Sequence, residues 1–169
     1  MYWEPKADTP REVLTNDLAI SSGFADDMLC LNQRNVDNAK GSLIGREQVE
    51  DGVRRGIDAG ELSRKAADAL LVVGDMQGYL DMAIETAAFY RVGRESQARE
   101  LERVLEKDVF PHLHPGMGDA YAGLRDRYVA LQTDLSVAAL TKWCEGVLGI
   151  LSNALADEGL KVEYRVDEV

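Results

Sequence analysis

Apolar residues recur at three- and four-residue steps along most of the chain, which is the spacing of amphipathic helices. The first stripe starts at Thr9-Pro10-Arg11-Glu12, where the threonine, proline and glutamate form a capping box. Later stripes end at or near glycines, as helices commonly do. The predicted helices span residues 9–20, 24–38, 63–73, 76–90, 94–109 and 119–157, the last of them long and kinked near Thr133-Asp134.

A glycine-rich stretch at 45–60 has apolar residues four apart, and Gly52, Gly56 and Gly60 repeat at the same interval. Each glycine costs a helix about 1 kcal/mol relative to alanine. A weak surface helix is therefore the favoured interpretation, and a tight contact with another helix is the alternative. Two prolines and two glycines at 110–118 predict the principal loop, because they interrupt any helix there.

The spacing of apolar and polar residues changes in the last ten residues. Apolar and polar residues alternate strictly from Leu160, with Leu160, Val162, Tyr164 and Val166 on one side, and this predicts a β-strand. Residues 1–159 contain no convincing second strand, so the backbone amides and carbonyls of this strand have no mate within the chain. We therefore expect the mate to lie outside it.

These patterns together predict an all-α fold, a multi-helix bundle of about six or seven helices with a long C-terminal helix, followed by a short terminal β-strand. The helical bundle with its short N-terminal arm spans residues 1–159. The strand arm spans residues 160–169, with Gly159 closing the last helix.

The net charge of the chain argues against two classes of binding partner. The chain of 169 residues has 19 Lys and Arg against 30 Asp and Glu, a formal net charge of −11. Nucleic-acid binders and proteins of membrane surfaces need clustered positive charge, so neither class is expected. The first residues lack the apolar stretch of a secretory signal, and no apolar run reaches the roughly 18 residues of a membrane span. We expect a soluble cytoplasmic or intracellular protein.

Two cysteines, Cys30 and Cys144, lie among apolar neighbours, and the expectation is two buried thiols, with a disulfide as the alternative. Five aromatic residues fall on helix stripes, where core packing is favoured over a ligand pocket: Tyr79, Tyr90, Tyr121, Tyr128 and Trp143. Tyr2 and Trp3 precede the first helix, and they dock either on their own bundle or on a partner.

Catalytic signatures are mostly excluded. The chain has no G-x-G-x-x-G, no phosphate-binding loop, no G-x-S-x-G elbow and no E-x-x-H pair of a di-iron bundle. His112 and His114 are weak candidates for metal binding, which with Asp108, Asp119 or a distant cysteine would complete a zinc-like set. The two histidines supply only two of the four ligands that a zinc site requires, so no metal and no cofactor are predicted.

The predicted function is non-enzymatic: an assembly or adaptor subunit that forms a homo-oligomer or docks on a protein partner. The apolar side of the C-terminal strand, with Tyr2 and Trp3, would make the contact. By fold-level analogy alone, the architecture suits ring-forming connector proteins of tailed viruses. The alternatives are a metal-dependent enzyme centred on the His112 and His114 loop, and an acidic regulator that binds a basic partner surface.

Overall fold

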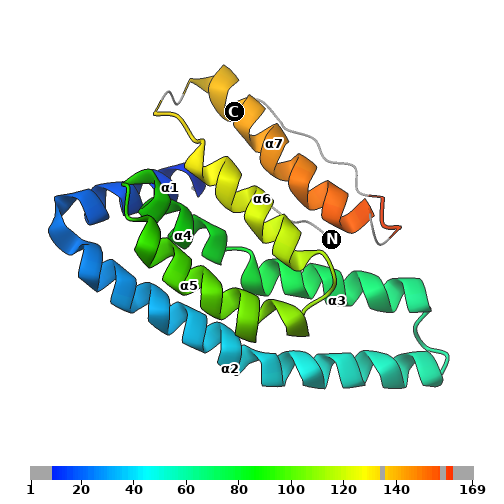
Figure 1. The fold of residues 1–169 in the computed structure, drawn as a ribbon. Helices are drawn as coiled ribbons and strands as arrows, with labels where there is room; N and C mark the ends of the chain where they lie inside the picture. The colour runs from blue at the N-terminus through cyan, green and yellow to red at the C-terminus, as the bar shows by residue number, and fades with distance from the viewer. Residues whose placement is uncertain (1–8, 134–135, 157–158, 162–169) are drawn as a thin grey trace.

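The computed structural model describes residues 9–133, 136–156 and 159–161, and the part it describes is all-helical, with no strand. Figure 1 shows the arrangement of the helices. The α-helices are α1 (Thr9–Ala19), α2 (Ala25–Asp58), α3 (Arg64–Tyr79), α4 (Met82–Arg91), α5 (Glu95–Asp108), α6 (Met117–Val129) and α7 (Val137–Ala156). A π-helical turn, Ile20–Phe24, joins α1 to α2, and a 3-10 turn, Phe110–His112, follows α5.

The bundle is built around α4, a short helix that is apolar on nearly every side. It packs against α1, α5 and α6, and Ala83, Ala87, Ala88 and Phe89 are completely buried. Helix α2 runs along one side of this centre and contacts α3 and α5, while α7 lies outside α6 (Figure 1). Small residues on α4 let its neighbours approach closely, which explains why a ten-residue helix can hold the centre of the bundle.

Helix α2 is longer than the sequence pattern predicts. The predicted end at Lys40-Gly41 is wrong, and so is the separate helix at 45–60, because one helix of 34 residues runs from Ala25 to Asp58. Its core-facing residues lie on both sides of Gly41 and Gly45, with Val36, Ala39 and Val53 buried and Leu43 half-buried, and their packing outweighs the cost of the glycines. Gly41 and Gly45 face open space, and Gly56 lies against Leu62.

Two other boundaries are corrected. Gly74-Asp75 does not break a helix: α3 continues through it to Tyr79, and the break comes at Leu80-Asp81. The long kinked helix predicted at 119–157 is two helices, α6 and α7, separated after Val129. Tyr121 and Tyr128 therefore lie on α6 and Trp143 lies on α7, and Asp119 is in the first turn of α6.

Several helix ends are confirmed. Gly93 and Gly159 have positive φ angles, 75° and 70°, and both close a helix by the Schellman pattern. At Gly159 the amide of Leu160 donates to the Leu155 carbonyl at 3.0 Å, and the Gly159 amide donates to the Ala156 carbonyl at 2.8 Å. The loop at 110–118 is also confirmed, apart from its 3-10 turn and the start of α6 at Met117.

The core contains most of the aromatic residues that the helix stripes place there. Tyr79, Tyr121, Tyr128 and Trp143 are buried, as predicted, and Tyr90 is half-buried against them. The prediction of two buried thiols is wrong for Cys30, which is exposed on the outer side of α2, whereas Cys144 is half-buried; both thiols are free. No helix in the described ranges is both long enough and apolar enough to cross a membrane.

Candidate functional site

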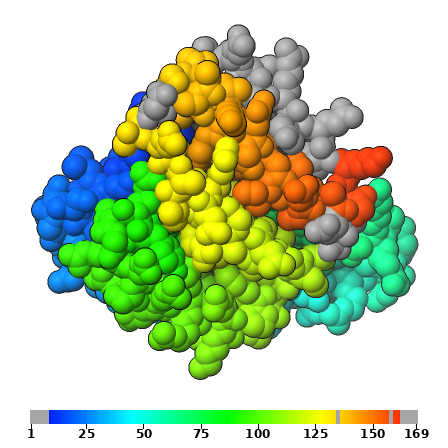
Figure 2. Space-filling model, turned by 45° about the horizontal axis from the view of Figure 1, so that its top comes forward, coloured from blue at the N-terminus to red at the C-terminus, as the bar shows by residue number. Residues whose placement is uncertain are grey.

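The C-terminal segment, residues 160–169, is attached to α7, and α7 is anchored on α6. Figure 2 shows these two helices side by side on one face of the molecule. The rings of Tyr128 and Trp143 stack with centroids 5.6 Å apart, and the Trp143 Nε1 donates to the Arg127 carbonyl at 3.3 Å. The indole is 7% exposed, so its hydrogen bond is protected from water. This pair fixes the rotation of α7 about its own axis.

Arg127 of α6 packs on the backbone of α7. Its Nη2 donates to the Lys142 carbonyl at 2.7 Å, and its guanidinium lies flat against the backbone of Gly146. A Cβ added at Gly146 would come within 2.5 Å of the guanidinium, so only glycine leaves room for this contact. One turn further, a Cβ at Gly123 of α6 would meet Ile150 of α7 at 3.3 Å. At each of these two glycines a side chain of one helix therefore packs directly on the backbone of the other.

The end of α7 directs the chain into the C-terminal segment. In the Schellman pattern at Gly159, the following residue packs back on the last turn of the helix, and Leu160 is half-buried against the core beside Leu155. Leu160 is thus the one predicted partner-contact residue whose position is described. The others lie outside the described residues: Tyr2, Trp3, Val162, Tyr164 and Val166.

The histidine loop is attached to the bundle by a buried ion pair. Asp75 of α3 is 2% exposed and accepts from Arg46 of α2 at 3.0 Å (Nε to Oδ1) and 3.1 Å (Nη2 to Oδ2). The same carboxylate accepts from the backbone amide of His114 at 2.7 Å. The hydrogen bond to Asp75 raises the pKa of Arg46, so the guanidinium stays charged.

The histidine side chains do not form a cluster of ligands. The His114 Nδ1 lies 3.0 Å from the carbonyl of Pro115, and His112 is exposed at the end of the 3-10 turn. In the part of the chain that the structure describes, no three His, Cys, Asp or Glu side chains converge as a metal site requires. The loop contributes the backbone amide of His114. Through this amide and Arg46, the Asp75 carboxylate links α2, α3 and the loop that precedes α6.

A second buried polar group links α4, α5 and α6. Glu102 of α5 is 6% exposed and accepts from the Tyr90 hydroxyl and from Arg125 Nη1, each at 2.6 Å. Burial, and then the bond to Glu102, raises the pKa of Tyr90 to about 12, so its hydroxyl remains a donor at neutral pH. Thr86 and Tyr121 share a hydroxyl–hydroxyl bond of 2.7 Å in the same region. These groups satisfy one another, and such an arrangement fixes the packing of the three helices.

The third polar group, between α2 and α4, is centred on Glu85, whose hydrogen-bond donor among the described residues is a neutral amide. Glu85 of α4 is half-buried and accepts from the Asn35 Nδ2 of α2 at 2.7 Å. The pKa of Glu85 is raised to about 7, first by burial and then by the carboxylates of Glu12 and Asp81, against the opposing effect of the bond from Asn35. One turn earlier on α2, Asn32 is 1% exposed with its Nδ2 unpaired.

Sequence reasoning missed all three polar groups. Asp75 falls beside a glycine, between the predicted helices 63–73 and 76–90, and Glu102 falls among the many charged residues of the helix predicted at 94–109. Glu85 lies within an apolar stripe, where a lone carboxylate is the signal that would have identified it.

Comparisons of the chain with protein-family models, with curated proteins and with solved structures gave no match.

Proposed function

We propose that the protein is a non-enzymatic assembly or adaptor subunit that binds a protein partner, or further copies of itself, through its C-terminal segment. The segment would add as a β-strand to a sheet edge of the partner. Main-chain hydrogen bonds would supply affinity, and the alternating side chains would set the register.

The observation that carries the proposal is the way α7 ends. The Schellman pattern at Gly159 stops the helical hydrogen bonding, and the sequence changes there from a helical period to strict alternation. An alternating segment next to a completed helix has no reason to continue the helix. Its amides and carbonyls need partners of another kind.

The anchoring of α7 supports the same proposal. A segment that transmits binding to the body of a subunit needs a rigid attachment, and α7 is fixed by the Tyr128–Trp143 stack and by the contact of Arg127 with Gly146. Rigid attachment lowers the conformational entropy that is lost on binding, because only the segment itself has to become ordered.

Hydrogen exchange of the C-terminal segment tests the proposal at the level of its hydrogen bonds. In the full chain, amides at 160–169 should exchange more slowly as the protein concentration is raised, or when the partner is added, because strand pairing protects them. Amides of α7 serve as the internal reference. Exchange of the segment at the free-peptide rate in the assembled state would contradict strand addition.

A further inference from the structure

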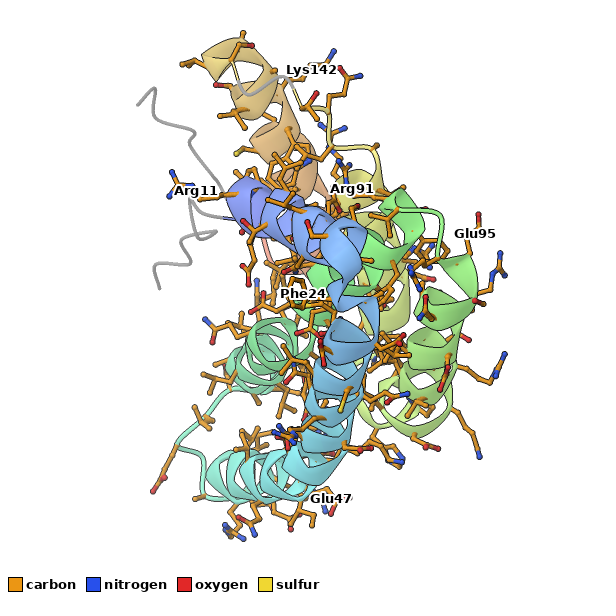
Figure 3. All side chains as sticks on the ribbon, turned by 90° about the vertical axis from the view of Figure 1, so that its left-hand side faces the viewer. Arg11, Phe24, Glu47, Arg91, Glu95 and Lys142 are labelled. Carbon is orange, nitrogen blue, oxygen red and sulfur yellow. The ribbon has the colours of Figure 1, made fainter. Side chains whose placement is uncertain are left out.

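A surface groove of about 260 Å³ lies between α2 and α5. Figure 3 shows the two helices side by side, with α2 passing from Phe24 to Glu47 and with Glu95 at the start of α5. Six residues line the groove, three from each helix: Gln33, Val36, Asp37, Glu100, Leu101 and Val104. Three of them are apolar and three are polar, so the groove offers two kinds of contact.

The floor of the groove is apolar. Val36 is 3% exposed and Leu101 is 2% exposed, and Val104 is half-buried. The groove is smaller than the sites that enclose a small-molecule ligand, which measure about 300–1,000 Å³. It therefore suits one side chain of a partner, and an aliphatic stem is the part of such a side chain that would cover the floor.

The rim of the groove consists of the polar residues Gln33, Asp37 and Glu100, which are all exposed and present hydrogen-bond acceptors. The Gln33 Nε2 donates to the Glu100 Oε1 at 3.1 Å, and the Gln33 Oε1 and the Glu100 Oε2 have no donor among the described residues. Asp37 accepts no hydrogen bond within the described part of the chain, and it acts on the Lys40 ammonium at longer range. A ligand group that suits this rim has donors, no acceptors and a positive charge.

The cations of α2 and α5 that lie closest in sequence leave the rim charges unpaired. Lys40 Nζ is bound to the Asp108 carboxylate at 2.8 Å. Arg34 and Arg103 are exposed, and neither of them lines the groove. Within the described residues, neither arginine forms an ion pair with a carboxylate of the rim. The two negative charges of the rim are thus available to a cation from outside the chain.

We propose that this groove binds an arginine side chain of a basic protein partner. The aliphatic stem of the arginine would lie on Val36 and Leu101, and its guanidinium would lie between the carboxylates of Asp37 and Glu100. Arginine fits better than lysine, because its planar fork of five donors can reach acceptors on both walls at once. The net charge of −11 favours the approach of a basic partner. The site goes beyond the proposed function, because neither α2 nor α5 belongs to the C-terminal segment.

NMR titration of the isotope-labelled full chain tests the groove, with acetyl-Ser-Arg-Ser-amide as the probe. Backbone amides at 33–37 and 100–104 should shift most, and the shifts should saturate in the millimolar range of a single exposed side-chain contact. The same peptide with citrulline, which replaces the guanidinium by a neutral urea group of similar shape, should cause no such shifts. The lysine peptide should bind several-fold more weakly.

Matched variants separate the groove from general attraction by an acidic protein. Asp37→Asn and Glu100→Gln should each raise the dissociation constant of the arginine peptide about fivefold, and together they should abolish saturable binding. Glu47→Gln on α2 and Glu106→Gln on α5 remove the same charge from exposed positions outside the groove, and they should leave the dissociation constant unchanged. Val104→Phe, which fills the groove without changing the charge, should also prevent binding.

Several results would overturn the proposal: absence of saturable shifts at 33–37 and 100–104, shifts spread over the acidic residues of the whole surface, equal binding of the citrulline peptide, or equal effects of Glu47→Gln and Asp37→Asn. Asp37 and Glu100 are exposed, so their variants should keep the fold, and they test the groove even if Val104→Phe does not fold. Shifts of these amides with spermidine but not with the arginine peptide would assign the groove to a free polyamine and would overturn the protein partner.

Discussion

Asp75 and Arg46, 29 positions apart in sequence, form a two-point ion pair in which the carboxylate is 2% exposed and the guanidinium 14% exposed. The pair closes the long hairpin of α2 and α3, and its carboxylate also holds the backbone of His114. Geometry of this kind gives strong, charge-assisted hydrogen bonds, but it leaves a buried charge when either partner is removed.

Arg46→Ala should therefore destabilise the fold strongly, by about 3 kcal/mol, because Asp75 would keep a buried charge with the His114 amide as its remaining donor among the described residues. Thermal and urea unfolding measure the loss. Arg54→Ala on the same helix is the matched control: that side chain is 66% exposed, and its ion pairs should contribute less than about 1 kcal/mol. Equal losses in the two variants would show that the buried pair has no special role.

Gly146→Ala should weaken the attachment of α7 to α6. The new methyl group would meet the Arg127 guanidinium at 2.5 Å and displace this flexible side-chain end from the Lys142 carbonyl, at a cost of about 1 kcal/mol, which offsets the gain in helix propensity. The fluorescence of Trp143, stacked on Tyr128, reports the disturbance, with Trp3→Phe as the background so that a single tryptophan remains.

Gly149→Ala is the control for this contact, because a Cβ there meets nothing within 4 Å. The change should stabilise α7 by up to about 1 kcal/mol through helix propensity alone. Adding Arg127→Ala to Gly146→Ala should recover part of the loss by making room for the methyl group. A Gly146→Ala variant that is stabilised as much as Gly149→Ala would contradict the packing described for α6 and α7.

Alanine at Gly41 or Gly45 should stabilise the protein by about 0.5–1 kcal/mol each, because both glycines are inside a continuous α2 and face open space. Gly23→Ala should have the opposite sign, since φ is 105° at that position. The urea midpoints of the three variants measure the sign and size of these changes in stability. If α2 were two helices broken at Gly41, as the sequence pattern alone suggests, Gly41→Ala would not be stabilising.

These comparisons show where sequence reasoning succeeds. Helical periodicity identifies the helices because burial of a stripe is local information: Tyr121, Leu124 and Tyr128 are three and four apart and are all buried. Glycine with positive φ, at Gly93 and Gly159, marks true ends for the same reason, since the conformation needed is a property of one residue.

Sequence reasoning fails where partners are distant. Gly41 and Gly74 have the same identity as true helix ends, and only the packing of α2 and α3 shows that the helices continue through them. The charge run of α5 hides Glu102, because its donors Tyr90 and Arg125 come from other helices. Most of the candidate site, from Val162 onward, still rests on sequence pattern.

The mass of the protein in solution tests the central claim most directly. We predict that the full chain is an oligomer, and that proline at both Val162 and Tyr164, which removes two strand amides, raises its dissociation constant by at least about tenfold and yields monomer. Alanine at both Lys161 and Glu163, on the opposite side of the alternation, should leave the oligomer intact. Circular dichroism of both variants serves as the control and should show unchanged helix content. Two results would contradict assembly through the C-terminal segment. The first is an oligomer that the two prolines leave unaltered. The second is a full chain that is monomeric at all concentrations and has no partner whose binding the two prolines abolish.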